Sequence, residues 1–546
     1  MFRSLLFVAL LATAAAAAPT KPNLVMVLTD DQDVLLGSMQ AMPKVKKLIV
    51  EQGVNFTNAF IATPICCPSR SSYVSGMYQH NHKCYQNGVN DGPGRDETKG
   101  GCSSPYFQAA GGPESQSPAA VLKKAGYVTQ YAGKYLNQYG TPNGGNVTHV
   151  PVGWDSWLGL VGNSRYYGYS VSRNGTSEPH GHDYNNDYFT DLIKNETLRF
   201  LDAHMAGPKP FFVWAATPAC HGPNDPAPQY QDSFATPGTA PRTPNWNTGQ
   251  VGKNEFNSLT YHPAMNVSAV AYSDITYRRR LEVLKSVDDL VEEVIDKLTA
   301  GGVLEKTVFL YTSDHGYHLG QFAMIYDKRT PYEHDVRIPF YVRLPKDLMT
   351  QDQMALVGST SDAIVSNVDV APSLAQLGGG QILSGYDGHS WATLLGIAGL
   401  ATDGRSTAAK GRRTDTLIEY WGQTSNPTMT PPGFSVPPLW KGPHAVKWWQ
   451  DRVENTWSCV RMPPMAGEKG DAIFCQWFMN WPDKANNTVA FEEYYNIADD
   501  PYQMSNGMGN VKKMPPATLA ALRARLLALR NCVGNKDCNA PARVPM

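Results

Sequence analysis

Two adjacent cysteines, Cys66 and Cys67, are the residues that most narrow the chemistry of this chain. They open the segment Cys-Cys-Pro-Ser-Arg, which ends at Arg70. Neighbouring cysteines rarely bridge to each other, because a disulfide needs two side chains that face each other from separate backbone positions. The 546-residue chain has 9 cysteines, and an odd number leaves at least one over after pairing. We therefore expect one of the two to have a chemical role.

Acidic residues form a second group. Asp30 and Asp31 directly follow one short apolar run, and Asp314 and His315 directly follow another. Clustered carboxylates repel one another unless a cation lies among them, and oxygen ligands suit calcium or magnesium, while an imidazole also permits a transition metal. Taken alone, the first pair would fit a loop or helix cap better. Together with the second pair and Cys66, it predicts a divalent metal site.

The elements that must position these residues follow from hydrophobic periodicity. Apolar runs at 23–29, 211–217 and 307–313 predict buried parallel strands that end in polar residues, the second of them near His221. Apolar residues at three-to-four spacing over 277–299, followed by two glycines, predict an amphipathic helix. This alternation indicates an α/β fold with a sheet covered on both faces, whose ligands gather at the carboxyl ends of the strands.

Several charged residues receive structural interpretations. The arginine run 278–280, at the start of that helix, is predicted to be a solvated face rather than an anion site. His80 and His82 lack the Cys-x-x-Cys or His-Glu-x-x-His partners of a zinc site, so structural or substrate-side roles are expected.

The composition changes from about residue 401, where Pro, Trp and Gly become frequent. Alternating aromatic and polar residues over 457–481 predict an antiparallel sheet, and a Leu-, Ala- and Arg-rich stretch over 517–530 predicts a helix. A chain of this length exceeds a single compact core. We predict a signal peptide at 1–18, a catalytic domain at 19–405 and an α+β subdomain at 406–546.

The N-terminus has one positive charge, a short apolar stretch and small residues before Pro19, which predicts a secretory signal peptide. The alternative is a membrane anchor, but the stretch is shorter than the ~20 residues that span a bilayer. We therefore predict a protein of the secretory pathway, extracellular or lysosomal, without a membrane span. A net charge of -1, from 47 basic and 48 acidic residues, leaves no electrostatic footprint for nucleic acid.

In an exported chain, Asn-x-Ser/Thr sequons are candidate glycosylation sites, of which we expect only some to be used. They lie at Asn55, Asn146, Asn174, Asn195, Asn266 and Asn486. The oxidising compartment also favours disulfides between cysteines near in sequence. The candidate pairs are Cys532 with Cys538, Cys459 with Cys475, and Cys84 with Cys102. Cys67 is expected to be structural, with Cys220 or another distant cysteine as its partner.

The segment from Cys66 to Arg70, followed by Ser75-Gly76, resembles the signature of type I sulfatases, in which the first cysteine is converted to formylglycine. Four other segments resemble the same family, most closely its N-acetylglucosamine-6-sulfatase branch and related arylsulfatases. These segments are 21–33, 132–137, 217–219 and 312–322. The resemblance runs from about residue 21 to 395. It implies an α/β, alkaline-phosphatase-like sandwich with a large mixed, mainly parallel sheet flanked by helices, plus a smaller C-terminal α+β domain with an antiparallel sheet.

Carried onto matching positions, the resemblance implies a set of metal ligands. Asp30, Asp31, Asp314 and His315 would bind one Ca²⁺, and the modified side chain of Cys66 would complete the site. Many relatives have Asn where His315 stands, which leaves the metal preference open.

The same resemblance implies catalytic roles. Arg70 would hold the hydrate derived from Cys66, while Lys134 and Lys328 would bind the sulfate ester and offset charge on its oxygens. His221 would protonate the leaving group, alone or with Lys328.

One position departs from the family pattern. Many arylsulfatases have a histidine where Leu136 stands here, and His318 or Asn137 could take its place.

The mechanism that follows from the resemblance has two steps. A hydroxyl of the formylglycine hydrate attacks sulfur to give a sulfo-enzyme intermediate, and the second hydroxyl then drives the release of sulfate. A formylglycine-generating enzyme is an expected partner during maturation. The expected substrates are N-acetylglucosamine-6-sulfate-type glycans or aryl sulfates. Alternatives are a phosphatase or phosphonate hydrolase of the same superfamily, and a non-catalytic secreted glycan-binding relative.

Overall fold

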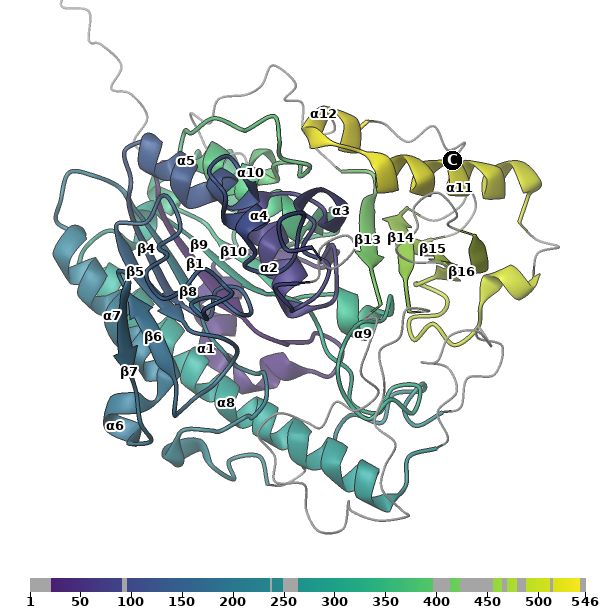
Figure 1. Cartoon of the computed structure of the whole chain (residues 1–546), viewed down its shortest axis with the longest axis horizontal. Coiled ribbons are helices and arrows are strands. Elements are labelled where there is room, and N and C mark those ends of the chain that lie inside the picture. Colours follow the sequence, from purple (N-terminus) through teal and green to yellow (C-terminus); the bar gives the residue numbers. More distant parts are fainter. Residues whose placement is uncertain are drawn as a thin grey trace, which may run out of the picture.

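The computed structural model describes residues 21–90, 96–235, 238–248, 264–395, 413–422, 455–463, 469–478, 488–510 and 514–540. The predicted signal peptide, the predicted domain boundary at residue 405 and the sequon at Asn486 lie outside these residues, so they stay predictions. Figure 1 shows a large sheet with helices on the left and a smaller sheet on the right.

In the described part of the chain the large sheet has ten strands, in the order β11-β2-β10-β9-β1-β8-β4-β5-β6-β7. Their bounds are β1 (Asn23–Thr29), β2 (Gly53–Phe56), β4 (Val128–Gly133), β5 (Ser156–Leu160), β6 (Ser170–Arg173), β7 (Thr176–Pro179), β8 (Phe211–Ala216), β9 (Thr307–Ser313), β10 (Phe340–Arg343) and β11 (Ser359–Ser361). The central strands from β9 to β5 are parallel, and most outer pairs are antiparallel. The predicted mixed, mainly parallel sheet is confirmed, with all three predicted strands in it.

The central strand β1 shows why its sequence is a continuous apolar run. Leu24, Met26 and Leu28 pack into the core on one face of the sheet, while Val25 and Val27 pack into the core on the other. A strand buried on both faces has no polar alternation, because each side chain enters one of two cores.

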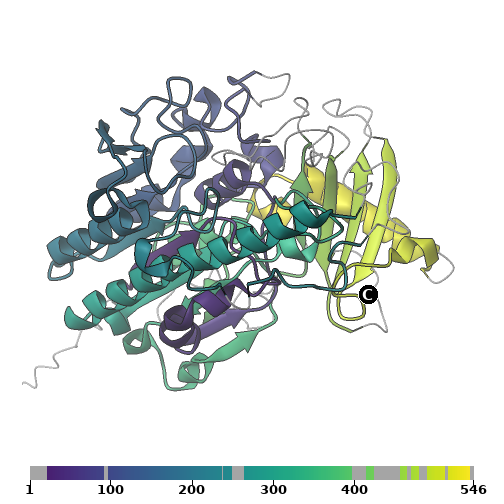
Figure 2. The ribbon, with the colours of Figure 1, turned by 90° about the horizontal axis from the view of Figure 1, so that it is seen from below.

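Helices cover both faces. On the Val25 side lie α7 (Phe189–His204) and α8 (Val267–Ala300), which run side by side in Figure 2. On the other side lie α2 (Cys66–Ser75), α5 (Pro118–Lys124) and α10 (Val370–Leu377). The predicted helix over 277–299 makes up the C-terminal two thirds of α8. The start of α8 is capped by Asn266 Oδ1, which accepts from Ala269 N at 2.9 Å. The first turns of α8 lack the apolar period, so the sequence did not reveal them.

Shorter elements connect these layers. They are α1 (Pro43–Val45), α3 (Gln79–His82), α4 (Pro105–Gln108), α6 (Tyr184–Asp187) and α9 (Glu333–Val336), with the paired strands β3 (Ala59–Phe60) and β12 (Val365–Ser366).

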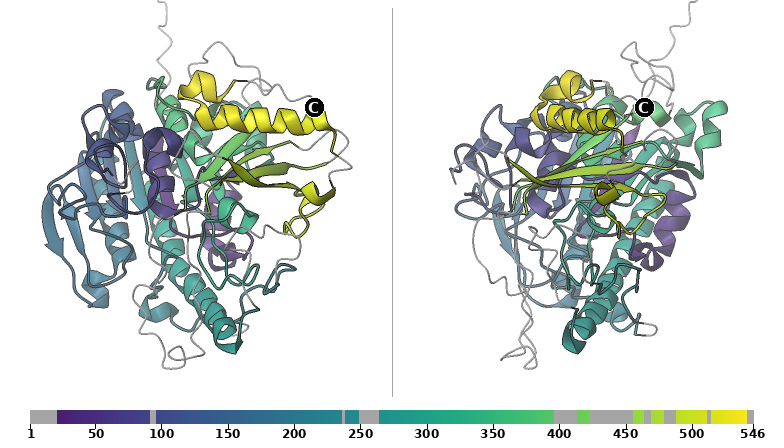
Figure 3. Two further views of the ribbon diagram at one scale, coloured as in Figure 1. Left: turned by 45° about the vertical axis from the view of Figure 1, so that its right-hand side comes forward. Right: turned by 90° about the vertical axis from the view of Figure 1, so that its right-hand side faces the viewer.

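The second sheet is antiparallel throughout, in the order β13-β14-β15-β16. Its strands are β13 (Thr416–Tyr420), β14 (Trp457–Met462), β15 (Ala472–Phe478) and β16 (Val489–Asn496). The helix α11 (Pro516–Asn531) lies across it, followed by α12 (Gly534–Cys538) (Figure 3). Leu522, Leu526 and Leu529 of α11 pack with Leu417 and Phe474 of the sheet. The predicted antiparallel sheet and the predicted helix over 517–530 are confirmed.

Two of the predicted disulfides are confirmed. Cys459 lies opposite Cys475 in the β14–β15 register and is bonded to it, and Cys532 is bonded to Cys538.

The predicted pair Cys84–Cys102 is wrong, because Cys102 is bonded to Cys67. The segment after α3 folds back, so that Cys102 N donates to the carbonyl of Gly88 at 2.9 Å and Cys84 Sγ lies 3.4 Å from Cys67 Sγ. Three sulfurs therefore meet, and spacing along the chain could not tell which two would bond. Cys220 as the partner of Cys67 is also wrong.

The described sequons differ in exposure. Asn146, Asn174, Asn195 and Asn266 are exposed, as glycan acceptors should be, whereas Asn55 is half-buried in β2. No described helix is both long and apolar enough to cross a bilayer.

Candidate active site

The carboxyl ends of four neighbouring parallel strands form the site. Asp30 follows β1, Asp314 follows β9 and Lys134 follows β4, while the loop after β8 carries His221. The ends of β1 and β9 are joined directly, because Asp31 N donates to Asp314 Oδ1 at 3.1 Å. The fold thus brings together residues that are far apart in the sequence.

Gly133 permits the close approach of β4 and β8 beside Lys134. Its φ is +131°, and a Cβ added there would lie 1.8 Å from the carbonyl oxygen of Ala216. Lys134 N donates to the same oxygen at 2.9 Å. Only glycine suits this position, which explains why a glycine directly precedes Lys134.

Three buried carboxylates each lie against one buried cation. The pairs are Lys134 Nζ with Asp30 Oδ2 at 2.5 Å, Lys328 Nζ with Asp31 Oδ1 at 2.7 Å, and Arg70 Nε with Asp314 Oδ2 at 2.8 Å. Burying a charged group costs free energy unless the group is paired. In each of these pairs the buried cation balances the charge of the buried carboxylate. A divalent cation added here would leave a net positive charge, which suits a monoanionic sulfate ester.

Cys66 is the first residue of α2 and is 1% exposed. Its Sγ lies 3.4 Å from His315 Nε2 and 3.9 Å from Asp30 Oδ1. Burial raises the pKa of the thiol, but Lys134 and Lys328 lower it more, so the pKa lies well below its ordinary value. The free N–H groups at a helix start favour an anion as well. The site therefore stabilises negative charge at position 66.

Arg70 lies one turn after Cys66, on the same face of α2. Besides its pair with Asp314, its Nη1 donates to the carbonyl of Lys134 at 2.7 Å, and its Nη2 lies 3.6 Å from Asp30 Oδ2. The guanidinium thus joins the ends of β4, β1 and β9 behind the cysteine.

His315 lies between two of the acids. Its Nδ1 is 3.3 Å from Asp31 Oδ1, and its Nε2 is 3.5 Å from Asp314 Oδ1. Burial lowers the pKa of His315, but Asp314 raises it more, to about 9. Burial and Asp30 together raise the pKa of Asp314 to about 6, although His315 and Arg70 lower it. These shifts are those of an acid-rich site that would bind a cation favourably.

His221 is partly exposed, whereas the other predicted site residues are buried. Burial lowers its pKa, but Asp31 and Asp30 raise it more. Its Nδ1 lies 2.6 Å from the carbonyl oxygen of Gly222, which can only accept, so Nδ1 carries a proton. A protonated ring at the solvent side of the site can donate a proton to a departing group.

The donor atoms are close enough to share one metal ion. Those of Asp30, Cys66, Asp314 and His315 lie within 4.8 Å of one another, and Asp30, Asp31 and His221 form an overlapping set. Three carboxylates fit a hard cation such as calcium, and an imidazole is the less usual ligand for it.

Two residues that contact the site were not predicted from the sequence. Ser164 Oγ donates to Asp30 Oδ2 at 2.7 Å, and nothing in the local sequence points to it. Arg280, predicted to be solvated, is 2% exposed and donates to the carbonyl of Asp31. That prediction is wrong because Arg280 precedes Leu284 by one turn and Val287 by two, which places it on the apolar face of α8.

The suggested substitutes for the histidine missing at Leu136 have other contacts. His318 Nδ1 lies 2.9 Å from Asp335 Oδ1, and the carbonyl of Asn137 accepts from Ser103 Oγ at 3.0 Å. Their part in catalysis stays a prediction. His82 Nε2 contacts Ser72 Oγ at 3.2 Å, which fits the structural role expected for it.

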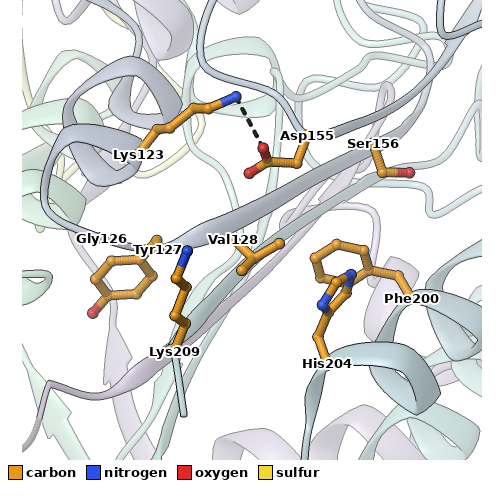
Figure 4. A pocket seen from close by; sticks show the side chains of 9 residues that line it. All are labelled: Lys123, Gly126, Tyr127, Val128, Asp155, Ser156, Phe200, His204 and Lys209. Carbon is orange, nitrogen blue, oxygen red and sulfur yellow. Dashed lines mark ion pairs between the residues drawn. The ribbon is translucent and has the colours of Figure 1, made fainter. Parts of the chain in front are cut away.

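A pocket lies at the opposite edge of the sheet, at the amino ends of β4 and β5 (Figure 4). It is lined by Lys123, Gly126, Tyr127, Val128, Asp155, Ser156, Phe200, His204 and Lys209. Lys123 pairs with Asp155 at 2.9 Å, with the two side chains 46% and 37% exposed. The predicted site residues lie at the other edge.

Comparison with known proteins agrees with the resemblance seen in the sequence. The sulfatase family profile matches residues 22–380. An N-acetylglucosamine-6-sulfatase of Capra hircus is 36% identical over 529 residues, which are 96% of this chain and 86% of the relative. An arylsulfatase of Chlamydomonas reinhardtii is 27% identical, with 98% of this chain and 78% of the relative covered.

A solved structure supports the fold. That structure shows a protein in complex with its substrate D-glucosamine-2-N,6-O-disulfate. It matches this chain with a TM-score of 0.66 and 20% sequence identity, and the match covers 93% of this chain and 97% of that one. At this identity the match shows the fold alone, and it confirms the alkaline-phosphatase-like architecture.

Proposed function

Because this chain belongs to the sulfatase family and is thereby a sulfuric ester hydrolase, we propose that it removes the 6-sulfate from N-acetylglucosamine residues of glycans, using the residues at the carboxyl edge of the large sheet. The observation that carries the proposal is the position of Cys66, at the start of α2 and beside the buried cations Lys134 and Lys328. The 36% identity to an N-acetylglucosamine-6-sulfatase supports the substrate.

The cations bind and stabilise the sulfate. Lys134 and Lys328 are 1% and 5% exposed, so their charges act in a poorly solvated space where electrostatic stabilisation is strong. Negative charge that develops on the sulfonyl oxygens and the leaving oxygen is offset by these ammonium groups. His221, on the partly exposed side, is placed to protonate the sugar oxygen as it departs.

A calcium ion fits the carboxylates of Asp30, Asp31 and Asp314, with His315 and residue 66 beside them. Bound there, it would supply positive charge that offsets the acids and stabilises an anionic oxygen at residue 66. Arg70 holds Asp314 and the end of β4 in place.

Conversion of Cys66 to formylglycine would supply, in its hydrate, an oxygen nucleophile and the second hydroxyl that a thiol lacks. Since Cys66 is 1% exposed in the folded chain, the formylglycine-generating enzyme must reach it before the domain closes. Mass spectrometry of the peptide that contains residue 66, from protein made in the native host, tests this step. A mass corresponding to unmodified cysteine throughout would contradict it.

The compartment proposed is the secretory pathway, with a lysosomal or extracellular destination. Three disulfides in the described residues, Cys67–Cys102, Cys459–Cys475 and Cys532–Cys538, support an oxidising environment.

A substrate panel tests the activity. We expect kcat/KM for N-acetylglucosamine 6-sulfate to exceed that for the 4-sulfate or 3-sulfate isomers and for an aryl sulfate. Faster turnover of aryl phosphate or a phosphonate monoester than of any sulfate ester would favour the phosphatase or phosphonate hydrolase alternative. Binding of sulfated glycan without turnover, by protein shown to carry formylglycine, would favour a non-catalytic binding protein.

A further inference from the structure

Arg280 makes three hydrogen bonds at the back of the site. It extends from α8, is 2% exposed, and donates from Nη2 to the carbonyl of Asp31 at 2.6 Å and to Asp33 Oδ1 at 2.9 Å. Its Nη1 lies 3.4 Å from the carbonyl of Cys220. The guanidinium therefore spans two loops that follow different strands, β1 and β8.

Both loops carry residues of the proposed site. Asp31 has a φ of +62°, a conformation uncommon for a residue other than glycine, which the surrounding contacts must hold. Cys220 directly precedes His221, and the loops also bond directly, from Cys220 N to the carbonyl of Asp30 at 2.5 Å. A shift of either carbonyl would move a carboxylate or the imidazole.

Tyr317, in a third loop, covers the guanidinium. The Arg280 Cζ lies 4.0 Å from the centre of the Tyr317 ring, and Lys328 Nζ lies 5.7 Å from the same centre. Tyr317 follows Asp314 and His315 in the loop after β9. Arg280 thus contacts the loops after β1, β8 and β9.

The charge of Arg280 is balanced by Asp33. The Asp33 Oδ2 atom accepts from Leu36 N at 2.9 Å, so the carboxylate is anchored on its own loop. Because Asp33 pairs with the guanidinium, the carboxylate of Asp31 stays available to Lys328 and to a cation. The effect of Arg280 on the site is therefore geometric.

We propose that Arg280 is a positioning residue, which sets the distance between the acid loop (30–33) and the histidine loop (219–222) during sulfate ester hydrolysis. The inference deepens the proposed function and rests on it. The residue must be arginine, since a planar guanidinium can reach several acceptors at fixed angles, whereas a lysine ammonium acts as a point charge.

The test compares Arg280→Lys and Arg280→Met with Arg279→Lys, a neighbouring arginine on the same helix. Calcium chloride is titrated calorimetrically into the chelator-treated full chain, and kcat and KM are measured on an aryl sulfate. Because a misplacement of about 1 Å can cost 10²-fold in rate, we expect kcat of both Arg280 variants to fall by about 10- to 100-fold. We also expect the calcium affinity of both Arg280 variants to fall by about 10-fold, because the loop that carries Asp31 would be displaced. This is on the order of the effect of losing one charge-assisted hydrogen bond. The KM of the Arg280 variants should stay near that of wild type. The kcat, KM and calcium affinity of Arg279→Lys should also stay near the wild-type values.

Wild-type kcat and calcium affinity in a folded Arg280→Lys protein would overturn the proposal, even if Arg280→Met failed to fold. A lower melting temperature with both values unchanged would show a structural role and overturn it equally. If the wild-type protein turned over no sulfate ester, the proposed function would fail, and the calorimetric comparison would still show whether Arg280 affects calcium binding by the acid loop.

Discussion

At the carboxyl edge of the large sheet Lys134 contacts Asp30 with the two side chains 1% and 0% exposed, whereas at the amino edge Lys123 contacts Asp155 with 46% and 37% exposed. The residue types are the same, and both lysines lie next to the strand β4. An exposed ion pair is screened by water and salt and contributes little to stability. A buried pair interacts strongly, and removing one partner is strongly destabilising because it leaves a buried charge unpaired.

The difference comes from the loops at each edge. At the carboxyl edge the segments after β1, β8 and β9 and the start of α2 close over the charges, and Ser164 adds a hydrogen bond to Asp30. At the amino edge the pocket of Figure 4 stays open to solvent around Lys123, His204 and Lys209. Charge becomes chemically useful where the fold removes water from it.

The largest effect is expected for Cys66→Ala. Without the precursor of the nucleophile, kcat/KM should fall by about 10³-fold or more, in the range seen when a covalent nucleophile is removed. Sulfate release from an aryl sulfate measures it. The change replaces one small buried side chain with a smaller one, so the circular dichroism spectrum should stay unchanged. Turnover near that of wild type would show that the carboxyl edge does not react through this residue.

Calcium removal should come next. Exhaustive chelation should reduce turnover by about 10²-fold or more, because the charge that stabilises the transition state is lost. Readdition of calcium should restore it, and comparison with magnesium and manganese identifies the preferred ion. The amino edge offers a control, since Lys123→Met should leave the response to calcium unchanged. Full turnover after chelation would contradict the proposed metal site.

Lys134→Met and Lys123→Met form a matched pair on the two edges. Loss of Lys134 leaves Asp30 buried without its closest cation, so we expect kcat to fall by about 10²-fold and the calcium-free protein to lose about 3–5 kcal/mol of unfolding free energy. Loss of Lys123 should change unfolding free energy by no more than about 1 kcal/mol and kcat not at all. Thermal unfolding and steady-state kinetics measure both. Equal effects of the two substitutions on kcat and unfolding free energy would show that burial does not distinguish the two lysine–aspartate pairs.

A smaller effect, on stability alone, is expected where the two sheets meet. His80 Nδ1 lies 2.8 Å from Glu419 Oε1, and its Nε2 lies 2.9 Å from the carbonyl of Cys532, so both nitrogens face acceptors and the ring carries two protons. Burial lowers the pKa of His80, but Glu419 raises it more, and Asp387 adds to the rise. Burial of charge therefore does not by itself make a site catalytic.

The raised pKa of His80 determines how the stability of the protein depends on pH. The imidazolium stabilises the fold fully below the unfolded pKa of about 6.5, and this contribution disappears as the pH rises through the folded pKa. Glu419→Gln should therefore lower the unfolding free energy by about 1–3 kcal/mol at pH 5 and by less at pH 9. The kcat at the pH of the assay should not change. Denaturant unfolding at both pH values measures it, and a cost that does not depend on pH would contradict a charged His80.

The apolar runs predicted the central strands because burial on both faces requires continuous hydrophobicity, and the acids after β1 and β9 were therefore expected to meet. The short disulfides Cys459–Cys475 and Cys532–Cys538 followed from spacing. The pairing of Cys67 did not, since it depends on how residues 83–90 and 96–102 lie against α2 after folding.

The sequence by itself determined which residues could react, because the residue types and their order around Cys66, Asp30 and Asp314 are those that the proposed chemistry needs. Only the tertiary structure decided which charges are buried. Arg280 stands in a run of three arginines that looks solvated, yet it lies behind Asp31, and Ser164 has no local signal at all. The reason is physical: a residue type fixes charge and hydrogen-bonding capacity locally, whereas burial and pairing arise from segments that meet only after folding.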